Sequence, residues 1–414
     1  MVELLLIHTA DLHLGTTVYG EIDASTGMSK RIEDYFNVLD SIIDYSIKNK
    51  ADAFLICGDA FKNANPTPTT MKMFATRLRR LTTNGINVIM ICGNHDLPRA
   101  EAKSSPLEIY SEVGMEGVYL IKEPSFVDIT TREKKKVRIF AVPYIHPARA
   151  LIEVQNKKHD IKYENVVNAY REIHQKYIES FCESGRGDAD LCILMLHLGF
   201  FGVTKGTEET TFFLNGEFTL LPNLVQNNLF DYVAMGHIHK HQCCNGKVPV
   251  VYSGSIERCD FSEIDEKKGF VKINYDNSLK WEFIEIEPRK MLKIEIDGTS
   301  LEDVADKVRE EIKKVDIKDA IVKVVINISA DKRPIINYDE IKMMLKDAFY
   351  HEIDYYRVDE KNIIREAVFS ESLTPKEVFT RYLKQSTSSS PNERKVIERL
   401  GLDIIKEVEG QVIE

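Results

Sequence analysis

The sequence predicts a layered α/β fold for the first two-thirds of the chain, on three observations. Short apolar runs of strand length recur, and they end in glycine or polar residues. Segments whose apolar residues recur at helical spacing separate several of these runs. Clusters of aspartate, asparagine and histidine follow the strand ends, which is where ligand sites form in α/β sheets.

Ten segments have the length and apolar composition of strands. They are Leu4–Ile7, Ala53–Cys57, Val88–Cys92, Val118–Ile121, Val137–Val142, Leu191–Leu196, Tyr232–Met235, Val248–Tyr252, Gly269–Tyr275 and Trp281–Ile286. Helices are predicted after the first two strands by the sets Ile32, Phe36, Leu39, Ile43 and Ile47, and Met71, Phe74, Leu78 and Leu81. Gly85 suits the end of the second helix.

A different pattern begins near Met291 and predicts a second, smaller α/β domain. Strand, helix, strand, helix and strand alternate there, and the last four segments are Leu301–Val315, Ala320–Ile328, Tyr338–Phe349 and Glu352–Val358. The alternation is that of a small sheet with helices against it. We therefore expect three parts, at residues 1–288, 289–361 and 362–414.

The last part is expected to hold two helices joined by a linker. Thr374 is a suitable N-cap, Pro375 a first-turn residue and Glu377 the reciprocal capping partner. The Ser-rich linker is Gln385–Ser390, and the segment after Pro391 has its apolar residues mostly on one side. The two helices either fold back on their own body or dock on a partner.

Composition and apolar run length indicate the class of protein. A chain of 414 residues with 43% hydrophobic residues can bury more than one core. Its apolar runs are far shorter than the ~20 residues of a membrane helix, and its N-terminus lacks the pattern of a signal peptide. We therefore expect a cytoplasmic protein with no membrane segment.

The seven cysteines indicate neither a disulfide framework nor a zinc knuckle, because none has C-x-x-C spacing. Cys57 and Cys92 lie in apolar strand segments and are expected in the core. The adjacent Cys243 and Cys244 leave two interpretations open, metal binding and a structural place.

The net charge of −10 argues against a protein that holds nucleic acid through a global basic field. The best local candidate for such a contact is the segment TREKKKVR, at residues 131–138. This segment is either a nucleic-acid contact or the solvated tip of a hairpin.

Five polar clusters follow predicted strands: Asp11-Leu12-His13, Gly58-Asp59, Gly93-Asn94-His95-Asp96, His197 and Gly236-His237-Ile238-His239. Alternate residues of a strand-like D-x-H or H-x-H point the same way, so both members of each pair are expected to reach one site. Imidazole, carboxylate and amide donors without any thiolate suit Mn²⁺, Fe²⁺ or Zn²⁺. Two such ions about 3.5 to 4 Å apart can clamp a phosphate and activate water, so phosphate-ester hydrolysis is the predicted reaction.

The ordered string D-x-H, G-D, G-N-H-D, H and G-H-x-H resembles the calcineurin-like metallophosphoesterase superfamily over residues 4–260. The opening HTADLHLG, the segment YSGSIERCDFSE, the small second domain and the SLTP-led terminal hairpin resemble the SbcD/Mre-eleven nuclease family over nearly the whole chain. The resemblance implies a four-layer β-sandwich flanked by helices, a small capping domain that touches DNA, and a C-terminal helical hairpin.

The resemblance also implies the site residues. One ion would be held by Asp11, His13 and His239, and the other by Asn94, His197 and His237, with Asp59 as the bridging carboxylate. His95 would stay off the metals, contact the scissile phosphate and help to protonate the leaving oxygen. Asp96 either orients His95 or caps the following segment.

Other residues near the motifs do not match ligand positions. His8, His146 and His241 are expected to be structural or to support the ligands. Some members of the family carry a second histidine shortly after the bridging aspartate, where this chain has Phe61 and Lys62. Lys62 is a candidate contact to the phosphate backbone, which leaves the balance of exonuclease and endonuclease activity open.

The activity implied by the resemblance is Mn²⁺-dependent hydrolysis of DNA, by a 3′–5′ double-strand exonuclease and single-strand endonuclease with two Mn²⁺ or other divalent transition metals. The implied partners are DNA, the coiled-coil base of an SbcC-type ABC ATPase, and a second copy joined through the helices after the first two strands. The alternative is a small-molecule metallophosphodiesterase, for which the tethered terminal hairpin has no evident use. A non-catalytic scaffold is disfavoured because every expected ligand is present.

Overall fold

The computed structural model of the chain describes residues 4–98, 104–157, 162–200, 219–244, 246–299, 301–329, 337–358 and 398–402. The chain forms two compact units. The first comprises residues 1–294, 308–324 and 337–353, and the second comprises 295–307, 325–336 and 354–414.

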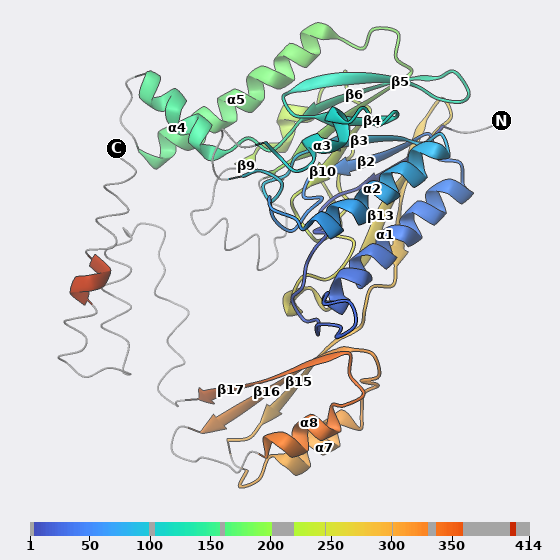
Figure 1. Cartoon of the computed structure of the whole chain (residues 1–414). Helices are drawn as coiled ribbons and strands as arrows, with labels where there is room; N and C mark the ends of the chain where they lie inside the picture. The colour runs from blue at the N-terminus through green and yellow to red at the C-terminus, as the bar shows by residue number, and fades with distance from the viewer. Residues whose placement is uncertain are drawn as a thin grey trace. The chain divides into compact units, whose positions relative to one another are not determined.

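The first unit contains a six-stranded sheet with the order β14-β13-β1-β2-β3-β4 (Figure 1). Its strands are β1 (Leu4–Thr9), β2 (Ala53–Cys57), β3 (Asn87–Ile91), β4 (Val118–Ile121), β13 (Lys268–Tyr275) and β14 (Leu279–Ile286). Strands β1 to β4 run parallel, whereas β13 pairs antiparallel with β1 and with β14. Every residue of β1 and β2 is buried, which explains why these strands are nearly continuous apolar runs.

A second six-stranded sheet has the order β11-β12-β10-β7-β6-β5. Its strands are β5 (Ser125–Thr130), β6 (Lys136–Val142), β7 (Leu191–His197), β10 (Tyr232–Gly236), β11 (Gln242–Cys244) and β12 (Val250–Tyr252). The four central strands run parallel, and the edge strands β5 and β11 are antiparallel to their neighbours. These two edge strands were not predicted, because neither is fully buried and neither is an apolar run.

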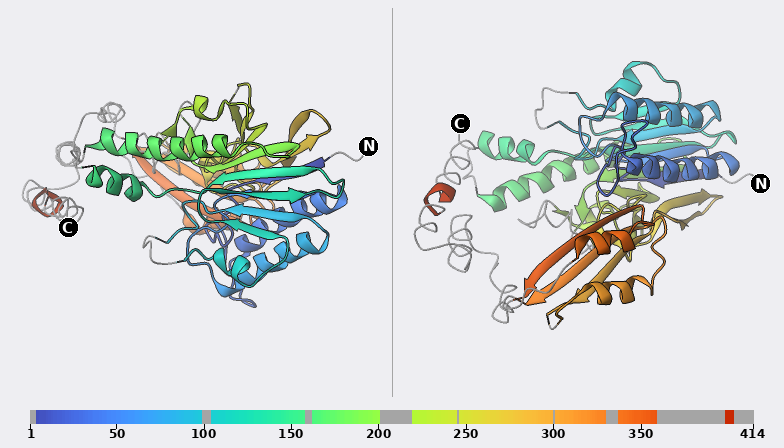
Figure 2. Two further views of the ribbon diagram at one scale, coloured as in Figure 1. Left: turned by 90° about the horizontal axis from the view of Figure 1, so that it is seen from above. Right: turned by 60° about the horizontal axis from the view of Figure 1, so that its bottom comes forward.

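The two sheets pack face to face, and helices cover both outer faces (Figure 2). The core between the sheets includes, from the first and the second sheet, Leu6, Leu55, Ile89, Ile139, Ile193 and Ala234. Helices α1 (Lys30–Lys48) and α2 (Pro68–Thr83) pack on the first sheet, and α4 (Pro147–Asn156) and α5 (Tyr163–Ser184) on the second. The predicted α/β class and the four-layer sandwich are therefore confirmed.

The two predicted helices begin and end at residues suited to capping. The side chain of Ser29 accepts a hydrogen bond from the amide of Arg31 at the start of α1, and that of Thr67 accepts one from Thr70 at the start of α2. Helix α2 ends two residues before Gly85, whose φ of +72° is the left-handed conformation that favours glycine at this place. Local sequence therefore decides these boundaries.

Several shorter elements complete this part of the chain. They are α3 (Glu108–Glu112), β8 (Gly199–Phe200), β9 (Thr219–Leu220), and the 3₁₀ helices η1 (Pro222–Val225) and η2 (Phe261–Glu263). The helices α3, α4 and α5 were not predicted from the sequence.

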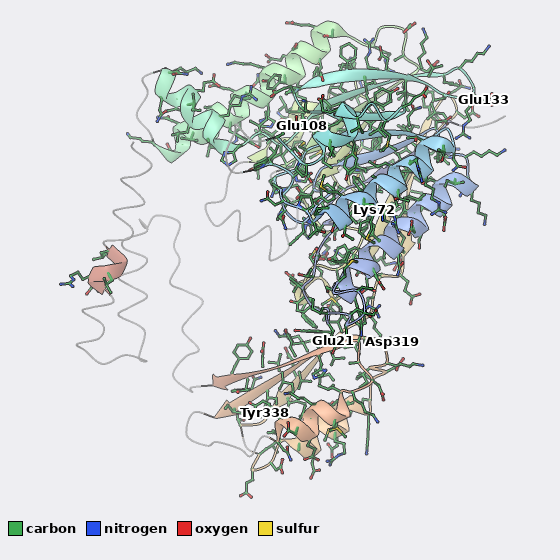
Figure 3. All side chains as sticks on the ribbon, in the orientation of Figure 1. Glu21, Lys72, Glu108, Glu133, Asp319 and Tyr338 are labelled. Atoms are coloured by element: carbon green, nitrogen blue, oxygen red, sulfur yellow. The ribbon has the colours of Figure 1, made fainter. Side chains whose placement is uncertain are left out.

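The segment at residues 131–138, expected to be either a nucleic-acid contact or a hairpin tip, forms the turn between β5 and β6 and the start of β6. Figure 3 labels Glu133, which lies in this turn. Its basic side chains contact the protein itself. Arg138 forms an ion pair with Asp128 at 2.7 Å, and Lys136 pairs with Asp188. Arg132 donates to the carbonyl of Ala51 at 2.5 Å. These contacts favour the interpretation as a hairpin tip.

The expected alternation after residue 290 is present as a three-stranded sheet with the order β15-β16-β17 and two helices. The elements in chain order are β15 (Met291–Asp297), α7 (Ala305–Ile312), β16 (Ile321–Ser329), α8 (Tyr338–Met344) and β17 (Tyr350–Val358). Each strand passes from the first compact unit into the second, so the domain boundaries expected at 288 and 361 stay predictions.

The expected linker and terminal hairpin lie outside the described residues, apart from a helical segment at 398–402. Within the part of the chain that the structure describes, no helix has both the length and the apolar character needed to cross a membrane.

Candidate metal centre

The five polar clusters lie at the carboxyl ends of central strands. Asp11 and His13 follow β1, Asp59 follows β2, Asn94 and His95 follow β3, His197 ends β7, and His237 and His239 follow β10. Because β1, β2 and β3 run parallel, and so do β7 and β10, these ends lie side by side in each sheet.

The paired motifs are not strand-like, contrary to the expectation. Strand β1 ends at Thr9, and beyond it Asp11 and His13 have φ angles of 52° and 42°. His237, directly after β10, has a φ of 90°. Left-handed backbone is costly for residues other than glycine and clusters at functional sites. Sharp turns, and not strand alternation, therefore direct these side chains.

Two glycines allow the loops to approach one another closely. A Cβ on Gly58, which has a φ of +89°, would lie 2.2 Å from Nδ1 of His197. A Cβ on Gly93 would lie 2.1 Å from Oδ1 of Asp59. Both distances are far below van der Waals contact, so the site requires glycine at both positions.

His13, His239 and Asp59 form one half of the site. The Nε2 atoms of His13 and His239 face each other at 3.0 Å. Oδ2 of Asp59 lies 4.0 Å from Nε2 of His13. All three side chains are buried. Two imidazole nitrogens and a carboxylate oxygen therefore converge on one point.

Asn94, His197 and His237 form the other half. Oδ1 of Asn94 lies 3.0 Å from Nε2 of His197 and 3.0 Å from Nδ1 of His237. Oδ2 of Asp59 lies 3.4 Å from Nε2 of His197. The same carboxylate oxygen thus faces a histidine of each half.

Asp11 lies close to both halves. Both of its carboxylate oxygens are 3.0 Å from the amide nitrogen of His237. Ligand atoms of Asp11, Asp59 and His197 all lie within 4.8 Å of one another, and the charge of His239 also lowers the pKa of Asp11. The geometry therefore brings Asp11 into the cage, and its grouping with His13 and His239 stays a prediction.

His95 lies at the margin of the cage. Its amide donates to Oδ1 of Asp59 at 2.8 Å, and its Nδ1 lies 2.9 Å from the carbonyl oxygen of Lys62. Because a carbonyl only accepts, Nδ1 carries a hydrogen and Nε2 is the atom left to meet a substrate. The ring is half-buried and stands edge-on to His13, with centroids 4.9 Å apart.

Among the described residues, the side chain of Asp96 contacts neither the His95 ring nor the segment that follows it, and binds other loops instead. Its carboxylate accepts hydrogen bonds from three backbone amides, those of Ala60 at 3.2 Å, Phe61 at 3.0 Å and Gly93 at 2.9 Å. These amides belong to the loops after β2 and β3. Asp96 therefore joins the loop that carries Asp59 to the loop that carries Asn94 and His95.

Burial and neighbouring charges set the protonation of the cage. Burial alone would raise the pKa of Asp59, but His197, His95 and His13 hold it well below its ordinary value. Burial lowers the pKa of His197, yet the charge of Asp59 prevails and raises it to about 9. Asp59 and His197 thus form a charged pair when no metal is bound.

Other members of the cage show the effect of burial directly. Burial lowers the pKa of His13 and of His237 well below the ordinary value, and nearby histidines lower both further. Burial raises the pKa of Asp11 to about 7. His13 and His237 are therefore neutral, which is the form in which imidazole binds a metal.

The donors fit divalent metal ions. In the described part of the chain, three overlapping groups have all their ligand atoms within 4.8 Å of one another. They are His13 with His239 and Cys259, His13 with Asp59 and His95, and Asp11 with Asp59 and His197. Among the described residues, Nδ1 of the fully buried His13 has no hydrogen-bond partner. Convergent imidazoles beside an anionic carboxylate are typical of a transition-metal site.

Two residues of the site are not part of the sequence motifs. Glu263, in η2, accepts a hydrogen bond from Nδ1 of His239 at 2.8 Å, and Cys259 lies beside His13 and His239. The donor set was expected to contain no thiolate, and that expectation stays a prediction, although the structure brings a thiol close to two of the expected ligands. Both residues stand in the segment YSGSIERCDFSE, which the sequence marked only through its resemblance.

His8, His146 and His241, which were expected to be structural or to support the ligands, make structural contacts. His8 contacts the hydroxyl of Tyr232 at 3.0 Å and the carbonyl of Met235 at 3.1 Å. The side chain of His146 accepts a hydrogen bond from the amide of Ala148 at the start of α4. His241 stacks on a phenylalanine of β14 with ring centroids 3.9 Å apart.

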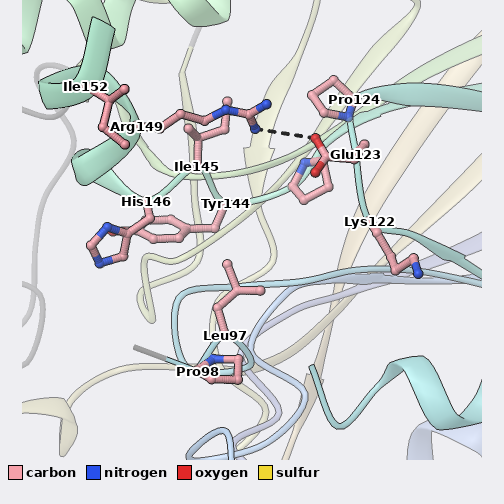
Figure 4. Close-up of a pocket in the computed structure, with 11 residues that line it drawn as sticks. Leu97, Pro98, Lys122, Glu123, Pro124, Tyr144, Ile145, His146, Arg149 and Ile152 are labelled. Carbon is pink, nitrogen blue, oxygen red and sulfur yellow. Dashed lines mark hydrogen bonds and ion pairs between the residues drawn. The ribbon is translucent and has the colours of Figure 1, made fainter. Parts of the chain in front are cut away.

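A cavity of about 490 Å³ opens next to the segment that follows Asp96 (Figure 4). Its lining consists of Leu97, Pro98, Lys122, Glu123, Pro124, Pro143, Tyr144, Ile145, His146, Arg149 and Ile152. Arg149 and Glu123 form an ion pair of 3.4 Å within it. None of the expected metal ligands lines this cavity, so it is distinct from the cage.

Known proteins share both the motifs and most of the chain. The SbcD subunit of the nuclease SbcCD of Staphylococcus epidermidis is 26% identical over 315 residues, which cover 74% of this chain and 75% of that protein. The DNA double-strand break repair protein Mre11 of Archaeoglobus fulgidus is 24% identical over 372 residues, 86% of this chain and 74% of that protein. The expected resemblance to SbcD and Mre-eleven proteins is confirmed by these matches.

Among solved structures, a dimetal phosphatase from Danio rerio aligns with 68% of this chain and 95% of its own, at 11% identity and a TM-score of 0.41. That likeness is too low to add to the assignment. The sequence profile of the calcineurin-like phosphoesterases matches residues 4–241, which include every residue of the expected cage. On this match and on the cage at the strand ends, the chain belongs to the calcineurin-like phosphoesterase family.

Proposed function

We propose that this chain is a DNA nuclease of the SbcD and Mre11 type, which hydrolyses phosphodiester bonds with two divalent ions of Mn²⁺ or another transition metal. The names of its relatives, a nuclease subunit and a DNA double-strand break repair protein, support DNA as the substrate. We further propose action as a 3′–5′ exonuclease on duplex ends and an endonuclease on single strands, in the cytoplasm, where the chromosome of a bacterium or archaeon lies.

The position of Asp59 is the observation that carries the two-metal proposal. One oxygen of this carboxylate lies 4.0 Å from Nε2 of His13 and 3.4 Å from Nε2 of His197. Those histidines belong to opposite halves of the cage. A single carboxylate between the donors of both halves is what two neighbouring cations require.

The remaining ligands divide between two positions. We propose that Asp11, His13 and His239 hold one ion and Asn94, His197 and His237 the other. When bound, two such ions would clamp the phosphate, lower the pKa of an attacking water and offset negative charge on the attacking and leaving oxygens.

His95 is proposed to act on the substrate directly. The Lys62 carbonyl holds its Nδ1 at 2.9 Å and the Asp59 carboxylate holds its amide at 2.8 Å, so both the ring and its backbone are positioned. When the ring carries a second proton, on Nε2, that atom can contact the scissile phosphate and deliver the proton to the leaving 3′ oxygen. Lys62 is proposed as a phosphate contact, and its small effect in lowering the pKa of His13 supports a position near the cage.

The other parts of the chain are given the roles that the resemblance implies. We propose that residues 289–361 cap the site and touch DNA, and that residues 362–414 dock on the coiled-coil base of an SbcC-type ABC ATPase. A homodimer through α1 and α2 completes the proposed assembly. Such a partner would supply the basic surface that a chain of net charge −10 lacks.

The test is cleavage of an end-labelled linear duplex by the purified protein with Mn²⁺, beside an EDTA control and the His95→Ser variant. The matched control is His146→Ser, since His146 is exposed and only caps α4. Shortening that needs metal, persists in the control and is lost in His95→Ser supports the nuclease. Intact DNA together with cleavage of bis-p-nitrophenyl phosphate would instead support the alternative, a small-molecule phosphodiesterase.

A further inference from the structure

Cys259 places a thiol in the metal centre. Its side chain is buried, with an exposed fraction of 6%. Its sulfur and one nitrogen each of His13 and His239 lie within 4.8 Å of one another. Two imidazoles and a thiol in such a group are a donor set for a metal ion. Cys57 differs from Cys259, because it is enclosed in the apolar core between the sheets.

The thiol and the imidazole are held by the same carboxylate. Oε1 of Glu263 accepts a hydrogen bond from Nδ1 of His239 at 2.8 Å, and its Oε2 accepts one from the amide of Cys259 at 3.0 Å. Lys268 holds that carboxylate at 2.7 Å, and all four residues are buried. A carboxylate behind a histidine is the usual support of a metal ligand, and here it also fixes the backbone that carries the sulfur.

Polar side chains contact the sulfur of Cys259. Cys259 and His239 share a side-chain hydrogen bond, and the hydroxyl of the buried Tyr35 donates to Sγ at 3.6 Å. His13, the third member of the group, is fully buried, and among the described residues its Nδ1 has no hydrogen-bond partner. Its Nε2 faces Nε2 of His239 at 3.0 Å.

We propose that Cys259 is a sulfur ligand of the ion held by His13 and His239. In a tetrahedral zinc site, bond lengths of 2.0 to 2.3 Å place nitrogen and sulfur ligand atoms about 3.3 to 3.6 Å apart, so the sulfur, now within 4.8 Å of both nitrogens, would have to approach by no more than about 1.5 Å. On binding, the S–H bond breaks, a sulfur–metal bond forms and the proton passes to solvent.

The consequence is an asymmetric centre. Thiolate is a soft ligand that selects Zn²⁺ over Mn²⁺, whereas amide oxygen and imidazole also suit Mn²⁺. The position of His13 and His239 therefore prefers Zn²⁺, and the position of Asn94, His197 and His237 accepts Mn²⁺. This inference rests on the proposed two-metal site, but not on DNA being its substrate.

The test is titration of the metal-free, full-length protein with Co²⁺, followed by absorbance. Cobalt bound by sulfur gives an intense near-ultraviolet charge-transfer band, and cobalt in any site gives weaker visible bands. The variant is Cys259→Ser, and the matched control is Cys182→Ser, whose thiol is exposed. Thermal unfolding of each variant verifies that it is folded.

We expect the charge-transfer band in the parent protein and in Cys182→Ser, and its loss in Cys259→Ser with the visible bands retained. Competition of Zn²⁺ against Mn²⁺ should shift toward Mn²⁺ by about tenfold or more in Cys259→Ser. Visible bands without a charge-transfer band in the parent protein, or a band that survives in Cys259→Ser, would overturn the sulfur ligand. Absence of all cobalt bands would overturn the metal centre as well, whereas inactivity on DNA with the band present would count only against the nuclease.

Discussion

Oε1 of Glu263 accepts a hydrogen bond from Nδ1 of His239 at 2.8 Å, so the imidazole is held with its Nε2 toward His13. The residues are 24 positions apart, and the carboxylate is anchored in turn by Lys268. The carboxylate is ionised, because these partners outweigh burial and lower the pKa of Glu263 to about 2.

The first prediction concerns this contact. Glu263→Gln should weaken metal binding by about 10 to 100-fold, because the amide neither orients His239 as firmly nor raises its basicity. Calorimetric titration with Mn²⁺ or Co²⁺ measures the change. The control is Glu266→Gln, which also removes a partner of Lys268, at 2.9 Å, but does not touch His239. Equal losses in the two variants would mean that the effect comes from Lys268.

The second prediction concerns the bridging carboxylate. Asp59→Asn should abolish hydrolysis and reduce the bound metal below two ions per chain, since one anion serves both halves of the cage. Metal content by elemental analysis and cleavage of bis-p-nitrophenyl phosphate give the two readouts. Asp40→Asn, which removes ion pairs with Arg77 and Arg80 and none with the expected ligands, is the control. Full activity in Asp59→Asn would contradict the two-metal site.

The third prediction concerns Asp96. Its replacement by alanine leaves the amides of Ala60, Phe61 and Gly93 without their acceptor in a buried place. The free energy of unfolding should fall by about 2 to 4 kcal/mol, and activity should fall with it because two ligand loops separate. Urea unfolding and hydrolysis of the small diester measure both. A variant as stable as the parent would show that these hydrogen bonds do not hold the loops.

The fourth prediction concerns the pH dependence of stability. Burial lowers the pKa of His8 to about 3, although the Met235 carbonyl opposes this. In the unfolded chain the pKa of this histidine is about 6.5, so below that pH the unfolded chain binds a proton that the folded chain does not. The contribution of His8 to the free energy of unfolding is therefore fully present above that pH and is lost as the pH falls toward 3. Between pH 7 and pH 5, His8 alone should lower the free energy of unfolding by about 2 kcal/mol.

His8→Asn should remove that share of the pH dependence. Urea unfolding at pH 5 and pH 7 would compare the parent with the variant, and His146→Asn is the exposed control. An unchanged difference between the two pH values in His8→Asn would mean that His8 does not remain neutral in the folded protein.

The fifth prediction concerns the end of the chain. Removal of residues 373–414 should leave Mn²⁺-dependent cleavage intact while ending co-purification with a coexpressed SbcC-type ATPase. The reason is that all the expected ligands lie between Asp11 and His239, whereas the proposed docking helices lie beyond Leu373. ATPase binding that survives the truncation would place the docking surface elsewhere.

The fold was predictable where the chemistry is local. The strands that are buried on both faces are apolar runs. Helix α2 follows its N-cap Thr67 and ends shortly before Gly85, as capping rules require. The edge strands β5 and β11 were missed because exposed strands carry no such run. The paired motifs were expected to be strand-like, but backbone bonds between loops turn them, as at Asp11, whose amide donates to the Gly58 carbonyl at 3.1 Å.

The sequence by itself determined the donor types and their order along the chain, because aspartate, asparagine and histidine after successive strands are readable without coordinates. Tertiary structure alone decided which of them meet. It set Asp59 between His13 and His197, and it brought Glu263 and Cys259 to His239. The physical reason is that coordination and hydrogen bonding act over a few ångströms between residues far apart in sequence, so only packing of the two sheets brings them together.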